Sequence, residues 1–248
     1  MEQMKFIVVV FVALCGIYST VEAQDKVSVA VYYESLCPDS IKFITKQLYP
    51  TLQHENLNKY IDLKLVPYGK SSQEFSSEGW RFICHHGPNE CYGNKVQACA
   101  LSLSKDNSNI VSKEVVGYIN CLMSKVDKDS NPFTYPTKEC ASANNIQNVV
   151  QIESCANGTE GSTALQQLGV TTQSLRPELK SVPTIIFDNL FNQEDQTLAV
   201  DNFQKALCLK LKNRDQIPEC QGSGAGFSTP LKIVTIASAV LVSVMHLY

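Results

Sequence analysis

Apolar and polar residues follow two spacings along this chain, one typical of strands and one typical of helices. The β-branched stretch Val27–Tyr33 predicts a strand, and the apolar positions of residues 41–52 recur at helical spacing. Residues Ile61–Pro67 alternate between apolar and polar side chains, which predicts a second strand. The first part of the chain therefore has the order strand, helix, strand, which is the βαβ unit of a parallel strand pair.

The middle of the chain has helical spacing over long stretches. Residues 79–125 combine cysteines with apolar positions at helical spacing, and further helices are predicted at residues 144–155 and 162–168. Gly169 follows the last of these helices and is a natural C-cap. We therefore expect a helical, cysteine-rich insertion after the βαβ unit.

The last third of the chain returns to strand patterns and then to a helix. Residues 184–187 form a short apolar stretch behind a proline, residues 188–189 predict a turn, and residues 190–191 are expected to begin a partner strand. Apolar spacing over residues 200–211 predicts a closing helix. The complete order predicts an α/β chain with a thioredoxin-like fold, in which a helical, disulfide-rich insertion separates the βαβ part from a ββα part.

Both ends of the chain carry segments that we exclude from the fold. Lys5 and the apolar stretch behind it predict a signal peptide over residues 1–23. Residues 222–248 combine a Gly/Ser spacer with an apolar tail, residues 233–248, that as a helix is roughly 24 Å long, short of the ~30 Å bilayer core. This pattern is typical of a glycolipid (GPI) anchor signal, with an uncleaved tail helix as the alternative. Residues 24–221 are then expected to form one domain.

The charge balance of the chain is nearly even. The 21 basic and 24 acidic residues give a formal net charge of -3. This charge is too small to indicate a nucleic-acid partner or a charged membrane surface as a partner.

The cysteine count indicates an oxidising compartment. Of ten cysteines, Cys15 falls in the predicted signal peptide, and the remaining number, nine, is odd. We expect a free Cys37 and four disulfides, whose connectivity stays open among about 105 pairings, with Cys208 to Cys220 as the best local guess. A glycosylation sequon at Asn157 agrees with a secretory path. The eight disulfide candidates are Cys84, Cys91, Cys99, Cys121, Cys140, Cys155, Cys208 and Cys220.

Cys37 is the candidate nucleophile of the chain. It follows the first predicted strand and precedes a helix in which Pro38 takes the first position and Asp39 lies in the first turn. A sulfur at the start of a helix lies near unpaired backbone N–H groups, which favour the reactive thiolate. The alternatives are that Cys37 is an inert buried thiol or a disulfide partner.

Ser40 stands where a Cys-x-x-Cys redox motif has its second cysteine. A dithiol reductase uses that second cysteine to resolve the mixed disulfide with its substrate, and a hydroxyl has no such redox chemistry. Ser40 can still donate a hydrogen bond to the Cys37 thiolate, whereas the negative charge of Asp39 acts against the thiolate. The motif therefore keeps the attacking sulfur and lacks the resolving one.

Val182 and Pro183 form a second candidate site at the start of the late apolar strand. With the Cys37 arrangement in view, we expect a cis bond between them. The backbone of the residue before such a proline can pair with an extended substrate peptide as an added strand. The alternative is an ordinary proline at a strand edge.

Cysteine and histidine, which are common zinc ligands, occur together between residues 84 and 99. The cysteine positions do not have the short spacing of zinc modules, and disulfides are the default in a secreted chain. We therefore expect neither a metal nor a cofactor. His54, His85 and His86 are expected to be surface or capping residues.

The same stretch carries a long motif, Cys84-x-His86-Gly87-x-x-Glu90-Cys91-x-x-Asn94-x-x-x-x-Cys99. It resembles the signature of the gamma-interferon-inducible lysosomal thiol reductase (GILT) family, and the resemblance extends over most of the chain between its two ends. The resemblance implies a thioredoxin-like fold with a helical insertion. It also implies reduction of disulfides in partly unfolded proteins within acidic endosomal compartments. The attacking cysteine of the family maps to Cys37, and its cis-proline maps to Pro183.

The chain departs from the family pattern at Ser40, where vertebrate members have cysteine, and at His85, where the signature has glutamine. We therefore expect a thiol-disulfide oxidoreductase with a single nucleophilic cysteine, which is resolved by a small thiol or by a thiol of the substrate. Its location would be the secretory pathway, as a secreted, cell-surface or endosomal/lysosomal protein, with membrane attachment through the tail. The alternative function is a redox-inactive or covalently trapping protein-binding module on the same fold.

Overall fold

The computed structural model describes residues 26–103, 111–127, 129–130, 133–212 and 214–221. The expected signal peptide, residues 1–23, and the expected anchor signal, residues 222–248, lie outside the described residues. Within the part that is described, no helix has both the length and the apolar character needed to cross a membrane.

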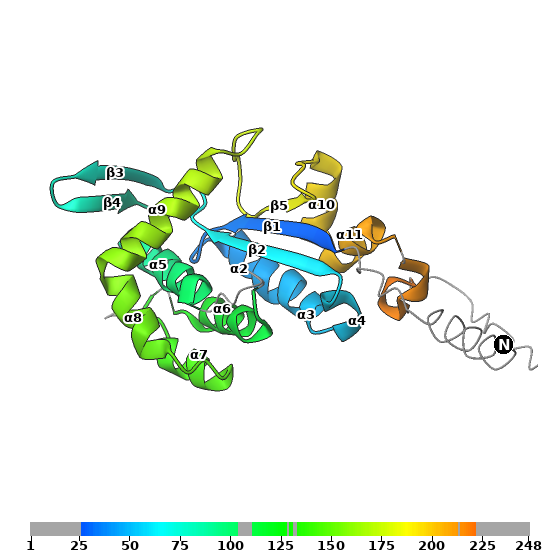
Figure 1. Cartoon of the computed structure of the whole chain (residues 1–248), viewed down its shortest axis with the longest axis horizontal. Helices are drawn as coiled ribbons and strands as arrows, with labels where there is room; N and C mark the ends of the chain where they lie inside the picture. The colour runs from blue at the N-terminus through cyan, green and yellow to red at the C-terminus, as the bar shows by residue number, and fades with distance from the viewer. Residues whose placement is uncertain (1–25, 104–110, 128, 131–132, 213, 222–248) are drawn as a thin grey trace, which may run out of the picture.

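A sheet of three strands in the order β2-β1-β5 forms the centre of the molecule (Figure 1). Strand β1 (Val27–Tyr33) pairs in parallel with β2 (Ile61–Pro67) and antiparallel with β5 (Thr184–Phe187). Both β1 and β2 have the bounds that the apolar pattern predicts. This topology is the predicted thioredoxin-like α/β arrangement.

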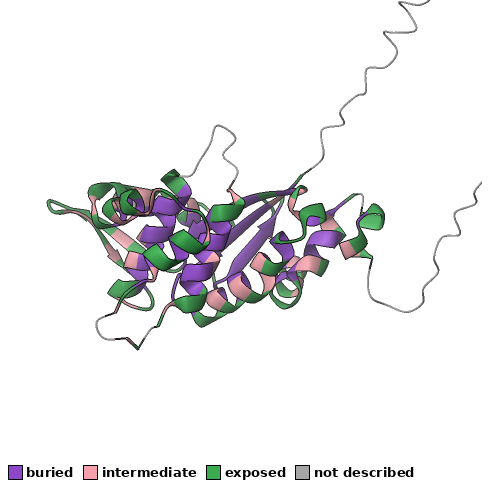
Figure 2. Ribbon diagram, turned by 90° about the horizontal axis from the view of Figure 1, so that it is seen from below, coloured by how far each residue is buried: buried purple, intermediate pink, exposed green. Residues whose placement is uncertain are grey.

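Both faces of β1 are covered, which explains why all its residues but Ser28 are apolar or aromatic and buried (Figure 2). Val29 and Val31 belong to the main core, which includes residues of the helices after β1 and of the insertion. Ala30 and Tyr32 belong to a second, smaller cluster with Ile186 of β5. The alternation along β1 therefore assigns successive side chains to two different apolar layers.

The helix predicted after β1 begins at Pro38 and continues to Leu52. It consists of α2 (Pro38–Phe43), a π-helical turn η1 (Ile44–Leu48) and α3 (Tyr49–Leu52). Pro50 has no N–H to donate to the preceding turn, and the π-turn lies directly before the segment that contains it. The short helix α4 (Glu55–Asn58) then leads into β2.

The insertion begins with a hairpin that the apolar pattern did not predict. Strands β3 (Ser72–Ser76) and β4 (Gly79–Ile83) pair only with each other, and β4 lies where helical spacing was expected. No side chain on either strand is buried, so the hairpin has no buried face to create an alternating pattern. Its cross-strand contacts are Phe75 against Trp80 and the ion pair between Arg81 and Glu74.

Five helices complete the described part of the insertion. They are α5 (Pro88–Leu103), α6 (Lys113–Lys125), α7 (Thr137–Ala143), α8 (Val149–Asn157) and α9 (Thr159–Gln173).

Gly169 lies inside α9 and is not the expected C-cap. A Cβ atom at this position would lie 2.7 Å from Cε2 of Tyr68 and would overlap the side chain of Gln73. The glycine therefore permits the close approach of α9 to the segment between β2 and β3.

The end of the fold differs from the predicted ββα part in two places. Residues 190–191 do not form a strand; Leu190 makes only an isolated bridge to Phe187, after a turn in which Asp188 and Asn189 have positive φ. The closing helix is divided into α10 (Gln193–Asp201) and α11 (Phe203–Lys210). Asn202 causes the division, because its side chain accepts a hydrogen bond from the N–H of Lys205 and caps a new helix. Two short 3-10 turns, η2 (Arg214–Gln216) and η3 (Pro218–Cys220), follow.

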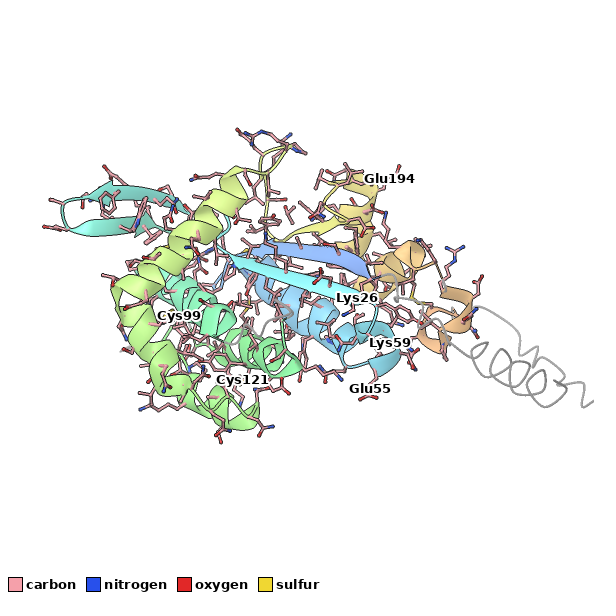
Figure 3. The ribbon with its side chains drawn as sticks, viewed as in Figure 1. Lys26, Glu55, Lys59, Cys99, Cys121 and Glu194 are labelled. Carbon is pink, nitrogen blue, oxygen red and sulfur yellow. A yellow bond between two sulfur atoms is a disulfide. The ribbon has the colours of Figure 1, made fainter. Side chains whose placement is uncertain are left out.

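Four disulfides join the eight candidate cysteines. One closes the loop before α5, one joins α5 to α8, one joins α6 to α7, and one joins α11 to η3. Cys99 and Cys121, the cysteines that α5 and α6 contribute to the second and third, are labelled in Figure 3. The pairs are Cys84–Cys91, Cys99–Cys155, Cys121–Cys140 and Cys208–Cys220, so the locally expected pair is joined.

Candidate active site

Cys37 lies at the junction between β1 and α2. It is the N-cap residue of α2, with extended backbone angles of φ -65° and ψ 125°, and Pro38 follows as the first helical residue. Its carbonyl accepts the hydrogen bond from the N–H of Ile41. Among the described residues it is the free cysteine, and it is only 7% exposed. The strand and the helix therefore fix the backbone on both sides of this sulfur.

Ser40 is fully buried one turn after Cys37. Its Oγ accepts a hydrogen bond from the backbone N–H of Glu34, with 3.3 Å between nitrogen and oxygen. This bond closes the turn that carries Cys37. The hydroxyl proton of Ser40 is not used in that bond and is still available to a neighbouring acceptor.

Glu34, a residue that the sequence did not single out, lies buried beneath this turn, with no exposed surface. Its Oε1 accepts a hydrogen bond of 2.7 Å from the backbone N–H of Lys70. Gly69 has φ +60°, and a Cβ there would lie 2.7 Å from Cδ of Glu34, so only glycine leaves room for the carboxylate. The other oxygen, Oε2, has no hydrogen-bond partner among the residues that the structure describes.

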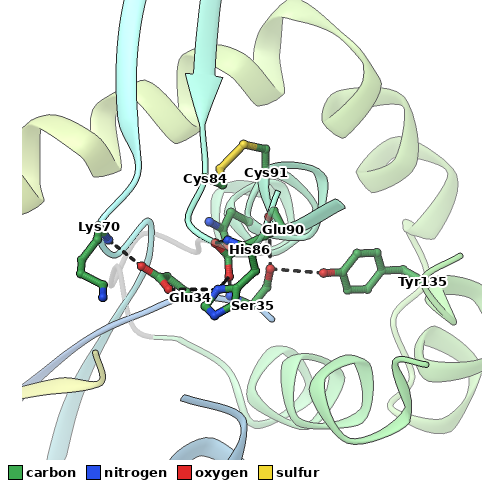
Figure 4. The surroundings of a disulfide bond; sticks show 9 residues. Glu34, Ser35, Lys70, Cys84, His86, Glu90, Cys91 and Tyr135 are labelled. Atoms are coloured by element: carbon green, nitrogen blue, oxygen red, sulfur yellow. Dashed lines mark hydrogen bonds and ion pairs between the residues drawn. A yellow bond between two sulfur atoms is a disulfide. The ribbon is translucent and has the colours of Figure 1, made fainter. Parts of the chain in front are cut away.

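His86 lies against two buried carboxylates (Figure 4). Its Nδ1 is 2.6 Å from Oε2 of Glu90 and 3.4 Å from Oε2 of Glu34. Oε1 of Glu90 also accepts the backbone N–H of His86 at 3.0 Å, which fixes the histidine at both its backbone and its ring. His86 is an exposed residue overall, as expected of a surface position, but its side chain is only 30% exposed and its ring faces Glu34.

Glu34, Cys37 and His86 come together at one point. The sulfur, a carboxylate oxygen and a ring nitrogen of these residues all lie within 4.8 Å of one another. A histidine beside a cysteine can accept the thiol proton, which yields the nucleophilic thiolate. In the sequence, about fifty residues separate His86 from Glu34 and Cys37. The motif around His86 was the only sequence signal that could have identified it as a site residue.

The helix α5 holds the segment that precedes Cys37. Asn94 is buried, and its Oδ1 accepts the backbone N–H of Ser35 at 2.9 Å. The Ser35 hydroxyl donates to the backbone carbonyl of Glu90 and lies 3.2 Å from the hydroxyl of Tyr135. Burial raises the pKa of Tyr135, so its hydroxyl stays protonated. The residues between Cys84 and Asn94 thus form one wall of the Cys37 site.

Pro183 lies at the same end of the sheet as Cys37. The Val182–Pro183 bond is cis, as the sequence analysis expected. Thr184 pairs with Tyr32, which places Pro183 beside the last residue of β1, four residues before Cys37. The carbonyl of Pro183 already accepts a hydrogen bond of 2.9 Å from Nε2 of Gln196.

Asn157, the expected glycosylation site, is the last residue of α8 and is exposed.

These features define a class of protein. A free cysteine between β1 and α2, with a proline at the start of β5 at the same end of the sheet, belongs to a thiol-disulfide oxidoreductase of the thioredoxin-like fold. Residues 28–144 match the family described as gamma interferon inducible lysosomal thiol reductase (GILT). The chain belongs to this family, since curated relatives share over two-fifths of its residues along nearly its whole length.

Three relatives show the range of similarity. A gamma-interferon-inducible lysosomal thiol reductase-like protein of Anopheles gambiae is 44% identical, over 93% of this chain and 96% of its own. GILT-like protein 1 of Drosophila melanogaster is 41% identical, over 93% of this chain and 91% of its own. The gamma-interferon-inducible lysosomal thiol reductase of Carassius auratus is 28% identical, over 80% of this chain and 73% of its own.

Two solved structures resemble this chain more distantly. DsbA of Chlamydia trachomatis aligns with a TM-score of 0.49 and 10% identity, over 73% of this chain and 85% of its own. Oxidised BdbD of Bacillus subtilis aligns with a TM-score of 0.48 and 14% identity, over 75% of this chain and 90% of its own.

Proposed function

We propose that Cys37 is the attacking thiol of this oxidoreductase and that a thiol from outside the chain completes the reaction. The observation that carries the proposal is that Cys37 is the free cysteine of the described part of the chain, while the other eight cysteines there form disulfides. Ser40 has no sulfur, so Cys37 cannot pass its substrate to a neighbouring thiol. A second thiol must therefore come from a small molecule or from the substrate.

The reaction begins when the Cys37 thiolate attacks one sulfur of a substrate disulfide. The other substrate sulfur leaves as a thiolate and takes up a proton. A small thiol, such as glutathione or cysteine, then attacks the mixed disulfide and releases the second substrate thiol, and another small thiol frees Cys37. In total the substrate gains two electrons and two protons, and two small thiols become one disulfide. Attack by a thiol of the substrate instead gives isomerisation without net electron transfer.

The substrates we propose are disulfide-containing proteins that are partly unfolded. Because Cys37 is only 7% exposed, a disulfide must enter a narrow approach to reach the sulfur. A disulfide in an extended chain can do so more easily than one within a folded surface. We propose that the backbone of Val182, beside Pro183, pairs with the extended substrate as an added strand.

We further propose that the protein works in the secretory or endolysosomal pathway. The four disulfides support this location, since disulfides persist in oxidising compartments. We propose removal of residues 1–23 as a signal peptide, one domain over residues 24–221, a glycan on the exposed Asn157, and attachment of a glycolipid anchor near the start of residues 222–248.

The second candidate function is a binding module that traps its partner covalently. The missing second thiol favours it, because a mixed disulfide at Cys37 has no internal route of release. The two functions differ in turnover and share the same first step.

The deciding experiment measures insulin disulfide reduction at pH ~5 with excess cysteine, where an ordinary thiol of pKa ≈ 8.5 is nearly all protonated and the background is low. The native protein, Cys37→Ala and Ser40→Cys are compared. Acceleration by the native protein and none by Cys37→Ala is the expected result. If only Ser40→Cys accelerates the reaction, the trapping module replaces the proposed function. Acceleration by Cys37→Ala equal to the native protein would exclude both.

A further inference from the structure

The three groups that meet at Cys37 have the donor chemistry of a metal site. A thiolate, an imidazole nitrogen and a carboxylate oxygen are the three kinds of ligand that bind Zn²⁺ in proteins. Here they come from Cys37, His86 and Glu34, and all three donor atoms lie within 4.8 Å of one another. Three protein ligands with a fourth position open are the usual arrangement of a reactive zinc site.

The carboxylate of Glu34 supplies an independent observation. Its side chain has no exposed surface, and its Oε1 is occupied by the N–H of Lys70. Its Oε2 is also buried and has no hydrogen-bond partner, although a buried polar atom normally has one. This oxygen faces Nδ1 of His86 at 3.4 Å and Nδ1 of the half-exposed His85 at 3.5 Å. The fold therefore holds in the site a carboxylate oxygen that no hydrogen bond from the described residues satisfies.

The separation of Glu34 and His86 fits two ligands of one ion. Oxygen and nitrogen ligands about 2.0–2.1 Å from a tetrahedral zinc are about 3.3–3.4 Å apart. The distance between Oε2 and Nδ1 is 3.4 Å, too long for a hydrogen bond and right for a shared cation. The sulfur needs to lie about 3.5 Å from each of these atoms. The sulfur lies within 4.8 Å of one carboxylate oxygen of Glu34 and one ring nitrogen of His86, so a side-chain movement is needed to complete the site.

Glu90 supports the site without being a ligand. Its Oε1 holds the backbone N–H of His86 at 3.0 Å, which fixes the position of that residue. Its Oε2 lies 2.6 Å from Nδ1 of His86, and this contact must open when Nδ1 binds the metal ion, because that nitrogen has a single lone pair. Two fully buried carboxylates, Glu34 and Glu90, thus lie against one imidazole.

We propose that Cys37, His86 and Glu34 bind a thiophilic divalent cation, with Zn²⁺ as the physiological example, and that the bound ion blocks the Cys37 sulfur. Binding forms the zinc–sulfur bond and releases the thiol proton to solvent, with no change of oxidation state. The ion would hold the oxidoreductase inactive until a chelating thiol removes it. That last consequence rests on the proposed function, whereas the binding itself does not.

The first experiment measures binding without activity. Metal-free, reduced protein is titrated with Co²⁺, and thiolate-to-cobalt absorption in the near ultraviolet is followed, after which Zn²⁺ is added to displace the cobalt. The native protein should give the band and lose it on addition of zinc. Glu34→Gln and His86→Gln should weaken zinc binding at least about tenfold, as measured by competition with a chelating dye. His85→Ala is the matched control and should bind as the native protein does.

The second experiment measures the block at the sulfur. Alkylation of Cys37 by iodoacetamide should slow strongly in Zn²⁺ and recover when a chelator is added, in the native protein and in His85→Ala. Circular dichroism and intact disulfides verify the fold of each variant, and either ligand variant alone suffices if the other does not fold. Equal zinc affinity of the native protein and a folded ligand variant would overturn the proposal. If the protein binds zinc but its metal-free form does not accelerate insulin reduction, the proposed function is refuted and the metal site stays in place.

Discussion

Gly69 is the residue through which the buried carboxylate of Glu34 can be tested. Its φ of +60° is in the left-handed region, and a Cβ there would lie 2.7 Å from Cδ of Glu34 and 2.5 Å from Oε1. The change Gly69→Ala therefore has two costs. The left-handed conformation costs a residue with a Cβ about 1–2 kcal/mol. Displacement of Glu34 also breaks its bond to the N–H of Lys70, and a hydrogen bond to a charged group is worth about 1.5–3 kcal/mol.

Together these costs predict a loss of about 2.5–5 kcal/mol in the free energy of unfolding for Gly69→Ala. The loss is large beside the total of about 5–15 kcal/mol of a typical domain. Gly79→Ala is the control, because Gly79 also has positive φ, at +101°, but nothing lies within 4 Å of its added Cβ. The control should lose only the conformational part. A φ of +101° lies further from the left-handed minimum than +60° does, so the control loses at least as much for conformation, and any additional loss in Gly69→Ala comes from the Glu34 contact.

The assay is urea unfolding with the disulfides intact, followed by circular dichroism, together with the rate of Cys37 alkylation. Gly69→Ala should shift the unfolding midpoint well below that of Gly79→Ala and should change the reactivity of Cys37, since Glu34 and Cys37 share one site. A loss of only about 1–2 kcal/mol for Gly69→Ala, the conformational part alone, would refute the argument that Glu34 is held against Gly69.

Three further changes test other parts of the structure. Asn94→Ala should lower the free energy of unfolding by about 1–3 kcal/mol in urea and slow insulin reduction, because it leaves the buried N–H of Ser35 unpaired. Asn202→Ala removes the cap of α11 and should cost about 1 kcal/mol, seen as a lower thermal midpoint. The pKa of Glu114 is lowered first by its own backbone N–H and then by Ser112, so its stabilisation is present above its usual pKa and lost as the pH falls through the lowered value. Ser112→Ala should therefore destabilise the protein at neutral pH and should lose less stability than the native protein on acidification.

Each of these three changes has a control variant or a result that would contradict it. Asn94→Asp keeps the accepting oxygen and should retain most of the stability that Asn94→Ala loses. Asn202→Ser keeps a capping side chain and should be close to the native protein. If Ser112→Ala loses as much stability in acid as the native protein, Glu114 is not held as described.

Local sequence patterns predicted the strands of the core and missed the hairpin, for a physical reason. Strand β1 is covered on both faces, and β2 alternates between buried and exposed residues. The order of apolar and polar residues in each strand therefore reflects which of its side chains are buried. The hairpin β3–β4 is mostly exposed and is defined by pairing between its own strands, which hydrophobicity does not record. Gly169 was misread because a glycine at a helix end and a glycine at a close helix contact look alike without the neighbours Tyr68 and Gln73.

Only the part of the candidate site that is set by neighbouring residues in the sequence could be predicted. Cys37 follows a strand and precedes Pro38, and these neighbours alone fix its place at the junction. Glu34 gave no such signal, because an acidic residue after a strand is ordinarily exposed. Its burial depends on the turn at Gly69, which lies on a different segment.

The spacing of the motif between Cys84 and Asn94 has a structural explanation. Glu90 and Asn94 are four residues apart on α5 and therefore lie on the same face of that helix. From that face the carbonyl of Glu90 accepts the hydroxyl of Ser35, and Asn94 accepts its N–H. The Glu90 side chain binds His86, whose segment is joined to α5 by the disulfide between Cys84 and Cys91. The motif thus fixes one histidine and one backbone segment against Cys37, so a change in α5 should alter the chemistry of a sulfur that α5 does not carry.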